Sequence, residues 1–154
     1  MPASSEFRYE VDRDNRIVSV DDAWRGFASD NGWKELASND VVGQDIARYV
    51  AGWDLVTLYG AIFDHVRKSG TPESIPFRCD SPTVKRYMEL EIATLPEGRL
   101  SLIGRLVRAI DHPYVPLLDL KRTRNGQWQI ICSVCRRIKR DDDSWGEIED
   151  SVEN

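Results

Sequence analysis

The hydrophobic pattern changes its period in a fixed order along the chain, and this order restricts the fold more than any other feature. Apolar and polar residues alternate in 7–11, and Ile17, Val18 and Val20 resume the extended pattern after the turn residues Asp14-Asn15, which predicts a β-hairpin. Apolar residues then recur every three or four positions in 55–66, which predicts a helix. Alternation returns in three further runs, 75–79, 84–92 and 100–106. We therefore predict two strands, several helices and three strands, in an α+β fold with an antiparallel sheet.

The helical segments carry recognisable start and stop signals. Asp21 or Asp22 can cap a first short helix, and residues 42–50 form a second short helical stretch. Asp54 can cap the long helix, and Gly70 can end it. We expect the helices to lie on one face of the sheet.

Both faces of the last predicted strand are apolar. Leu102 and Leu106 point to one face, and Ile103 and Val107 point to the other. An uncovered apolar face would promote association, so either the segment after Ile110 or a second subunit should cover it. We expect a homodimer formed through the sheet.

Composition places the chain among single-domain proteins with an extension. The chain has 154 residues, of which 41% are hydrophobic and 31% charged, and no apolar run approaches the length of a membrane helix. Residues 1–6 form a small polar tail without the features of a secretory signal. Three cysteines do not suggest a disulfide framework. We expect a cytoplasmic protein with a tail at 1–6, a domain at 7–110 and an extension at 111–154.

Charge is distributed unevenly near the C-terminal end. The formal net charge is −5, but seven Lys or Arg and no acidic residues occur from Lys121 to Arg140, and seven Asp or Glu and no basic residues follow from Asp141 to Asn154. The two blocks can neutralise each other as a solvated hairpin, or the basic block can face phosphate groups or a partner. The acidic tail argues against nucleic-acid binding.

The pair Cys132 and Cys135 is the clearest chemical motif. Two thiolates separated by two residues can converge on one soft cation or form a reversible disulfide. They supply half of a four-ligand zinc shell, and the basic residues from Arg136 to Arg140 favour the thiolate form for both chemistries. A zinc half-site completed by a second subunit, a redox-responsive dithiol and a pair without a ligand all remain open.

Three phrases resemble a bacterial subfamily of PAS-domain proteins. The phrase Val42-Gly43-Gln44-Asp45-Ile46 looks like the entry to the helices that line a PAS pocket, and Arg78-Cys79-Asp80-Ser81-Pro82 looks like the subfamily's RCDSP phrase. Residues 131–138 match its C-terminal ICSxCxRI phrase. The resemblance implies a PAS-like five-stranded antiparallel sheet with short helices on one face, followed by a CxxC hairpin and a helix that contains Trp145 and Glu147. Ser144 and Glu147 also fit a capping box for that helix.

The resemblance is incomplete beyond the cysteine pair. Relatives with the ICSxC phrase typically continue into an HGxCPxC phrase that resembles the other half of a four-cysteine metal site, and this sequence ends at Asn154 without it. A trimmed chain, a shortened family member and a site shared by two chains are all compatible with this departure.

A PAS-like fold implies a ligand cavity between the sheet and the longer helix. The pocket candidates, expected to contact a small apolar ligand, are Tyr49, Trp53, Phe63, His65, Cys79 and Met88. Cys79 also fits simple core packing. His65 lies beside the apolar stripe of its helix and not at its centre, which disfavours haem, and no phrase resembles the covalent flavin motif NCRFxQ.

No catalytic set is recognisable, so we expect a non-enzymatic sensory module that binds a small ligand or an unidentified signalling protein. The first alternative is a thiol-disulfide redox protein that uses Cys132 and Cys135. The second is a zinc-ribbon-like nucleic-acid-binding module that uses the basic block.

Overall fold

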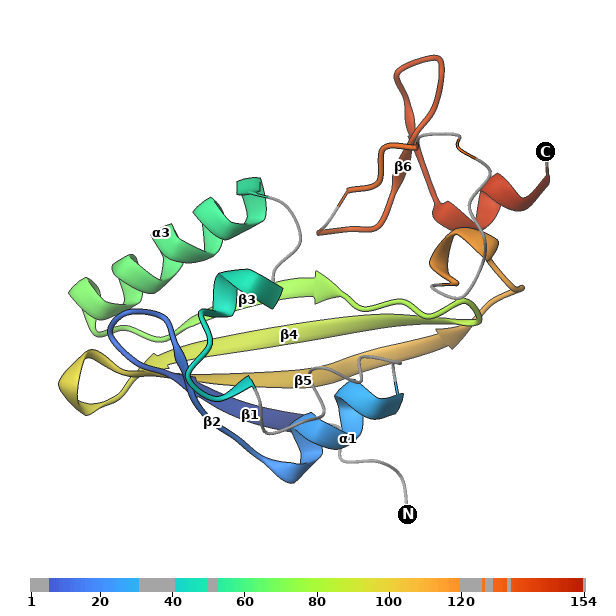
Figure 1. Cartoon of the computed structure of the whole chain (residues 1–154). Coiled ribbons are helices and arrows are strands. Elements are labelled where there is room, and N and C mark those ends of the chain that lie inside the picture. Colours follow the sequence, from blue (N-terminus) through green and yellow to red (C-terminus); the bar gives the residue numbers. More distant parts are fainter. Residues whose placement is uncertain are drawn as a thin grey trace. The chain divides into compact units, whose positions relative to one another are not determined.

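In the part of the chain that it describes, the computed structural model contains a five-stranded sheet, two α-helices and a small two-stranded sheet near the C-terminal end (Figure 1). It describes residues 6–30, 41–49, 53–119, 126, 129–132 and 134–153, without the side chains of 30, 49, 53–55 and 151–153. The predicted tail at 1–6 therefore lies almost entirely outside the described residues, as do Trp33 and Trp128. The α+β class is confirmed.

The elements follow the predicted order. The large sheet is formed by β1 (Glu6–Val11), β2 (Ile17–Val20), β3 (Glu73–Arg78), β4 (Val84–Thr94) and β5 (Leu100–Asp111), arranged β2-β1-β5-β4-β3. The α-helices are α1 (Asp22–Asp30) and α3 (Trp53–Ser69), and the small sheet pairs β6 (Ile138–Lys139) with β7 (Trp145–Gly146). Short 3-10 helices span Ile46–Tyr49, Pro96–Gly98, Pro116–Leu118 and Ile148–Glu153. The antiparallel sheet is consistent with a PAS-like fold.

The β1–β2 hairpin forms because its turn satisfies its own backbone. The Asp12 carboxylate accepts hydrogen bonds from the amides of Asp14 and Arg16, both at 2.9 Å. Asn15 takes a positive φ of 62°, which asparagine tolerates better than most residues. β1 then pairs with β5 from Glu6↔Arg105 to Val11↔Leu100. This register places β1 beside β5 in the middle of the sheet.

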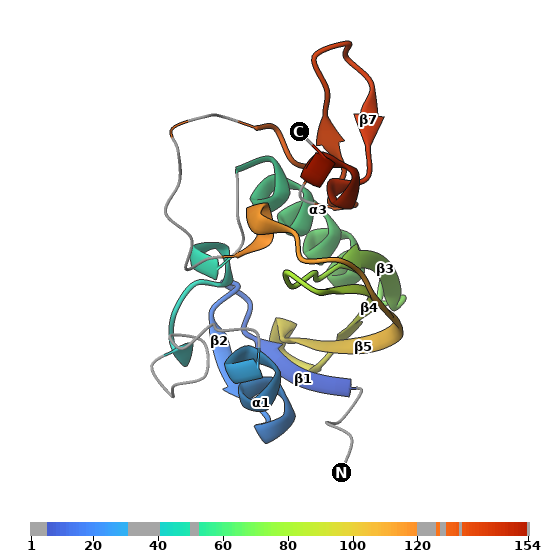
Figure 2. The same ribbon diagram turned by 90° about the vertical axis from the view of Figure 1, so that its right-hand side faces the viewer.

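Both α-helices pack against the sheet (Figure 2). Each of them begins or ends at a residue that the sequence analysis identified as a start or stop signal. The Asp21 carboxylate accepts a hydrogen bond from the Trp24 amide at 2.7 Å, which caps α1. Gly70, with a φ of +67°, ends α3 and donates to the Val66 carbonyl at 2.9 Å. The structure starts α3 at Trp53, one residue before the cap that we predicted.

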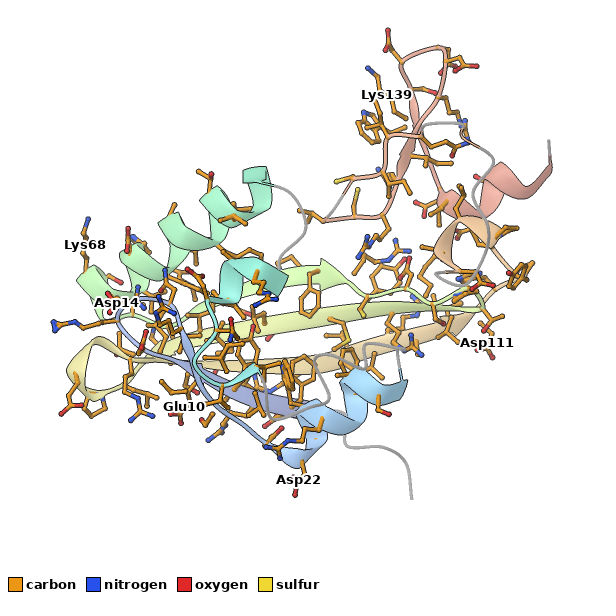
Figure 3. The ribbon with its side chains drawn as sticks, in the orientation of Figure 1. Glu10, Asp14, Asp22, Lys68, Asp111 and Lys139 are labelled. Atoms are coloured by element: carbon orange, nitrogen blue, oxygen red, sulfur yellow. The ribbon has the colours of Figure 1, made fainter. Side chains whose placement is uncertain are left out.

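Arg67 connects the end of α3 to two turns of the sheet. Its guanidinium donates to the carbonyls of Gly98 and Asp12, both at 2.9 Å, and to the Asn15 side-chain oxygen at 2.7 Å. By contrast, Lys68 on the next position of α3 is exposed and points away from the ribbon (Figure 3). A single side chain therefore fixes the C-terminal end of the helix.

The chain folds into two compact units. Unit 1 comprises Met1–Ile75 and Glu89–Leu106, and unit 2 comprises Pro76–Met88 and Val107–Asn154. Side chains without measurable exposure in unit 1 include Val11, Ile17, Val41, Val66, Ile92, Leu100 and Leu102. The buried apolar side chains of unit 2 include Cys79, Met88, Val115, Ile138 and Ile148. The domain boundaries predicted at residues 7, 110 and 154 stay a prediction.

On the apolar outer face of β5, Ile103 is 8% exposed and Val107 is 66% exposed, and the cover by the segment after Ile110 or by a second subunit stays a prediction. One sequence expectation needs correction. Ser144 does not cap a helix, because its amide donates to Asp142 at 3.0 Å and Trp145–Gly146 forms strand β7. The β-turn chemistry of Asp142 therefore overrides the capping box. The predicted homodimer stays a prediction.

No helix within the described ranges is long and apolar enough to cross a membrane.

Candidate functional site

The connection between β3 and β4 is built by the phrase Arg78-Cys79-Asp80-Ser81-Pro82. The Cys79 amide donates to the Arg86 carbonyl at 3.0 Å, and the Ser81 amide donates to the Val84 carbonyl at 2.9 Å. The Asp80 side chain is fully buried, and its carboxylate accepts a hydrogen bond from the Arg86 amide at 3.1 Å. Asp80 thus satisfies a backbone donor and places a negative charge inside unit 2.

Arg78 is the partner of this buried charge. Its guanidinium, 8% exposed, donates to both oxygens of Asp80, through Nε at 3.1 Å and through Nη2. Nη1 donates to the backbone carbonyl of Cys135 at 3.0 Å and lies 3.8 Å from Glu147 Oε2. The guanidinium also lies over the ring of Tyr87, 4.9 Å from its centroid. One side chain therefore joins β3 to the segment that carries the cysteine pair.

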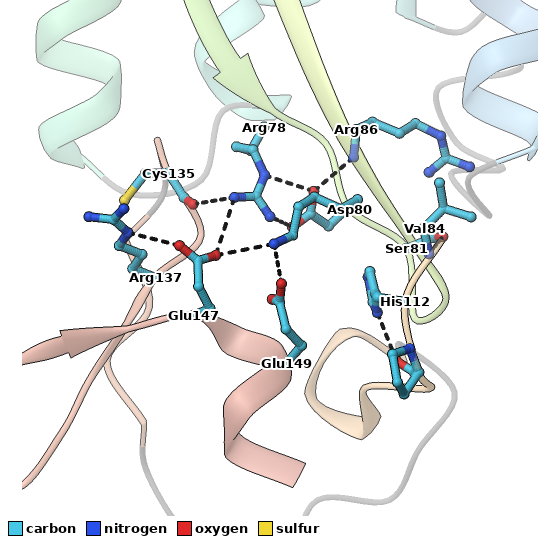
Figure 4. Close-up of polar contacts among 12 residues, drawn as sticks. Arg78, Asp80, Ser81, Val84, Arg86, His112, Cys135, Arg137, Glu147 and Glu149 are labelled. Atoms are coloured by element: carbon cyan, nitrogen blue, oxygen red, sulfur yellow. Dashed lines mark hydrogen bonds and ion pairs between the residues drawn. The ribbon is translucent and has the colours of Figure 1, made fainter. Parts of the chain in front are cut away.

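Lys85 makes a second connection from β4 to the C-terminal segment (Figure 4). Its ammonium, in a side chain 10% exposed, donates to Glu147 Oε2 at 3.2 Å and to Glu149 Oε1. Arg137 Nε donates to the other oxygen of Glu147 at 3.1 Å. Three cations and three carboxylates form what we call the Arg78–Lys85 network: Arg78, Asp80, Lys85, Arg137, Glu147 and Glu149.

The network shifts the pKa of its carboxyl groups. Burial raises the pKa of Glu147, but the hydrogen bonds from Lys85 and Arg137 outweigh it and hold that pKa below its ordinary value. At Glu149, burial also raises the pKa, but the hydrogen bond from Lys85 lowers it, and the pKa lies below its ordinary value. Burial lowers the pKa of Lys85, and its bonds to both glutamates raise it above the usual value. These three groups are therefore charged at neutral pH.

The CxxC turn, of which residues 131, 132 and 134–138 are described, is closed by backbone hydrogen bonds. The Cys132 amide donates to the Arg137 carbonyl at 2.8 Å, and the Arg136 amide donates to the Cys132 carbonyl at 2.9 Å. Ile131 and Ile138 form an antiparallel bridge, and Ser133 lies outside the described residues. Both cysteines are free thiols of intermediate exposure. Their assignment as metal ligands stays a prediction; the described residues contain no group of three or more His, Cys, Asp or Glu placed to hold a metal ion.

The predicted pocket residues fall in both units. In unit 1, Phe63 is 1% exposed, whereas the His65 ring is exposed, 3.4 Å from the Glu73 carboxylate. In unit 2, Cys79 and Met88 are buried. The side chains of Tyr49 and Trp53 lie outside the described residues. The pocket stays a prediction.

Sequence reasoning missed the Arg78–Lys85 network. It interpreted Glu147 as part of a helix cap and drew no conclusion from Lys85. The available signal was weak: Lys85 follows Val84 in a strand whose apolar positions alternate, so it belongs to the opposite face, where a lysine is normally solvated. Only the approach of a segment more than sixty residues away buries it.

Comparison with solved structures supports the fold. A domain of an HTR-like protein from Haloarcula marismortui matches with a TM-score of 0.51 and 14% sequence identity, over 68% of this chain and 100% of that domain. At this identity the likeness establishes the shared fold. No protein-family model matches the chain. The search of curated proteins also finds no match.

Proposed function

We propose that this chain is a non-enzymatic sensory or signal-transduction module that binds a small ligand or a partner protein through a PAS-like fold. The observation that carries the proposal is the fold itself, a five-stranded antiparallel sheet with two helices packed against it, similar to that of the HTR-like domain. The RCDSP and ICSxCxRI phrases add support, because they match a PAS-containing subfamily in the same order along the chain. Membership of that subfamily is part of the proposal.

The interior of unit 1 supports ligand binding of an apolar kind. Two aromatic pairs form in this unit: Phe7 stacks on Phe27 with centroids 4.7 Å apart, and Tyr59 contacts Phe63 edge to face with centroids 6.0 Å apart. Burial raises the pKa of Tyr9 far above its ordinary value, so this phenol stays neutral at physiological pH. A neutral aromatic interior suits an uncharged or weakly polar ligand.

The Arg78–Lys85 network supports an output through unit 2. Buried ion pairs add little net stability, but they specify one arrangement, because breaking one partner leaves an uncompensated charge. A ligand that binds one arrangement better than another shifts the population towards it, and a contact present in only one arrangement would report that shift. We therefore expect ligand or partner binding to change the environment of Glu147, Glu149 and the β6–β7 hairpin.

The ligand part of the proposal is tested with an apolar fluorescent probe, 1-anilinonaphthalene-8-sulfonate. Titration of the folded full chain should reveal one saturable site. We expect Phe63→Leu to weaken binding at least tenfold, because Phe63 lies inside unit 1, while Leu58→Ala on the same helix leaves it unchanged, because Leu58 is 46% exposed. Non-saturating binding, or equal binding by both variants, would refute a ligand site near α3.

The output part is tested by amide hydrogen exchange with and without the probe. Binding should alter exchange at Trp145 and Gly146 in the chain with an intact network. In Lys85→Met the probe should still bind, but exchange in β7 should no longer respond to it. An identical response in Lys85→Met would rule out the network as the route.

A further inference from the structure

Tyr9 projects from β1 towards the helix side of the sheet in unit 1. Alternate residues of a strand share one face, and the neighbours of Tyr9 on its face, Phe7 and Val11, are 7% and 0% exposed. The Tyr9 ring also contacts Trp24 of α1, with ring centroids 6.1 Å apart. Tyr9 itself is only half-buried. The packing around this one side chain is therefore less complete than the packing around either neighbour.

Tyr59 reaches the same region from α3. It precedes Phe63 by one helical turn, so the two side chains share a helix face, and their rings meet edge to face with centroids 6.0 Å apart. Phe63 is 1% exposed, whereas Tyr59 is half-buried. Burial raises the pKa of Tyr9, and a charge on Tyr59 raises it further. The two phenols therefore lie within electrostatic reach of each other, one on the sheet and one on the helix.

The hydroxyl groups of Tyr9 and Tyr59 are free to donate. Within the residues that the structure describes, neither phenol has a hydrogen bond or a nearby cation that affects its pKa, which burial raises in both. Both groups thus stay protonated at neutral pH. A phenol in a protein interior normally finds a partner for its O–H group, because an unpaired donor away from water is costly. These two donors are available to a bound molecule.

We propose that unit 1 binds a neutral apolar molecule with a carbonyl oxygen, and that Tyr9 and Tyr59 both donate to this oxygen; the proposal rests on the ligand-binding function proposed above. A carbonyl oxygen has two lone pairs, so it accepts from both phenols at once. A hydrocarbon would leave both donors unpaired. A carboxylate would lose its hydration among aromatic rings without gaining a cation. Trp24 and Phe63, beside the two phenols, supply apolar surface for the rest of the ligand.

The test uses three benzene derivatives that differ in one substituent: acetophenone, ethylbenzene and benzoate. Each is titrated into the folded full chain, and the amide resonances of the chain give its dissociation constant. Acetophenone should bind saturably, and benzoate should bind at least about tenfold more weakly, because its charge has no partner at the site. Benzoate binding as tight as that of acetophenone would overturn the proposal.

Two variants remove one donor each and keep the ring. In Tyr9→Phe and in Tyr59→Phe the dissociation constant of acetophenone should rise about fivefold, the effect of one net hydrogen bond, while that of ethylbenzene should not rise. The carbonyl stretching frequency of bound acetophenone should be lower in the natural sequence than in either variant, because accepting a hydrogen bond weakens the C=O bond. Tyr87→Phe, at a 38% exposed ring of unit 2, is the matched control and should change neither constant.

The outcomes separate this proposal from the proposed function. If acetophenone and ethylbenzene both bind but lose affinity equally in the variants, or if neither loses any, the ligand site stands and its assignment to carbonyl compounds is overturned. The same holds if Tyr87→Phe weakens acetophenone binding as much as the other two changes. If none of the three compounds binds saturably, both the apolar ligand site of the proposed function and the present proposal are overturned.

Discussion

At the scale of single residues, the structure separates side chains of the same type by their surroundings. The three cysteines are the clearest case, since burial suppresses ionisation of Cys79 while amides of the turn favour it at Cys132. Glycines differ in the same way. A Cβ on Gly104 would lie 2.2 Å from Cζ of Phe7, whereas a Cβ on Gly60 has no atom within 4 Å. Residue type alone therefore predicts little about tolerance to change.

We predict opposite effects for Gly104→Ala and Gly60→Ala. The first forces the buried Phe7 ring out of its place across the β1–β5 pair and should destabilise the fold by about 2–3 kcal/mol. The second lies inside α3. It reduces the backbone entropy of the unfolded chain and should stabilise the fold by about 0.5–1 kcal/mol. Urea unfolding of both variants measures the difference. Equal midpoints would contradict the close packing of Phe7 on β5.

At the scale of elements, unit 2 depends on charges that hold sequence-distant segments together. Arg78 and Lys85 come from β3 and β4, and their acceptors come from the CxxC turn and the segment after β7. The Arg78 and Lys85 side chains have little access to water, whereas Lys139 and Asp143, whose charged atoms lie 2.8 Å apart, form an exposed pair. Such buried networks contribute specificity more than net stability.

We predict that Lys85→Ala costs about 1–3 kcal/mol of unfolding free energy, because it leaves the partly buried Glu149 carboxylate without the cation that pairs with it, while Glu147 keeps its bond to Arg137. The matched change Lys139→Ala breaks an exposed pair and should cost less than about 0.5 kcal/mol. Denaturant titration of both variants provides the comparison. If the two losses were the same size, the network would be no more than a surface feature.

We also predict that acid loosens the C-terminal segment. The pKa values of Glu147 and Glu149 are lower in the folded chain than in the unfolded one, so their contribution is fully present above the unfolded value of about 4.3 and is lost as pH falls through the folded values. Amide exchange in β6 and β7 should therefore accelerate below about pH 4, beyond the intrinsic pH effect. Glu149→Gln should weaken this dependence, and Glu97→Gln, at an exposed turn, should leave it intact.

At the scale of the whole molecule, the homodimer formed through the sheet is still a prediction. On the apolar outer face of β5, Ile103 is buried, whereas Val107 is 66% exposed. Large exposed aliphatic side chains on a strand are a common feature of self-association surfaces.

We predict a homodimer that Val107→Glu dissociates, since a charge would be buried at the contact. Val42→Glu, at another exposed valine, should leave the mass unchanged. Light scattering at several concentrations measures both variants. A monomer in the natural sequence, or a dimer that survives Val107→Glu, would exclude association through this part of β5.

The sequence by itself determined the order and type of the elements, because hydrophobic period, caps and turn residues act over a few positions. The β1–β2 turn at Asn15, the Asp21 cap of α1 and the Gly70 stop of α3 are all local chemistry. Where local signals competed, as at Ser144, the prediction of a capped helix was wrong.

Only the tertiary structure decided which charges are buried together. Lys85 and Glu149 are 64 positions apart, and nothing in either neighbourhood distinguishes them from solvated residues. The same holds for the Cys135 carbonyl, whose partner Arg78 lies 57 positions away. Water normally satisfies such groups, and they become structural only when folding removes that water and supplies the opposite charge in its place.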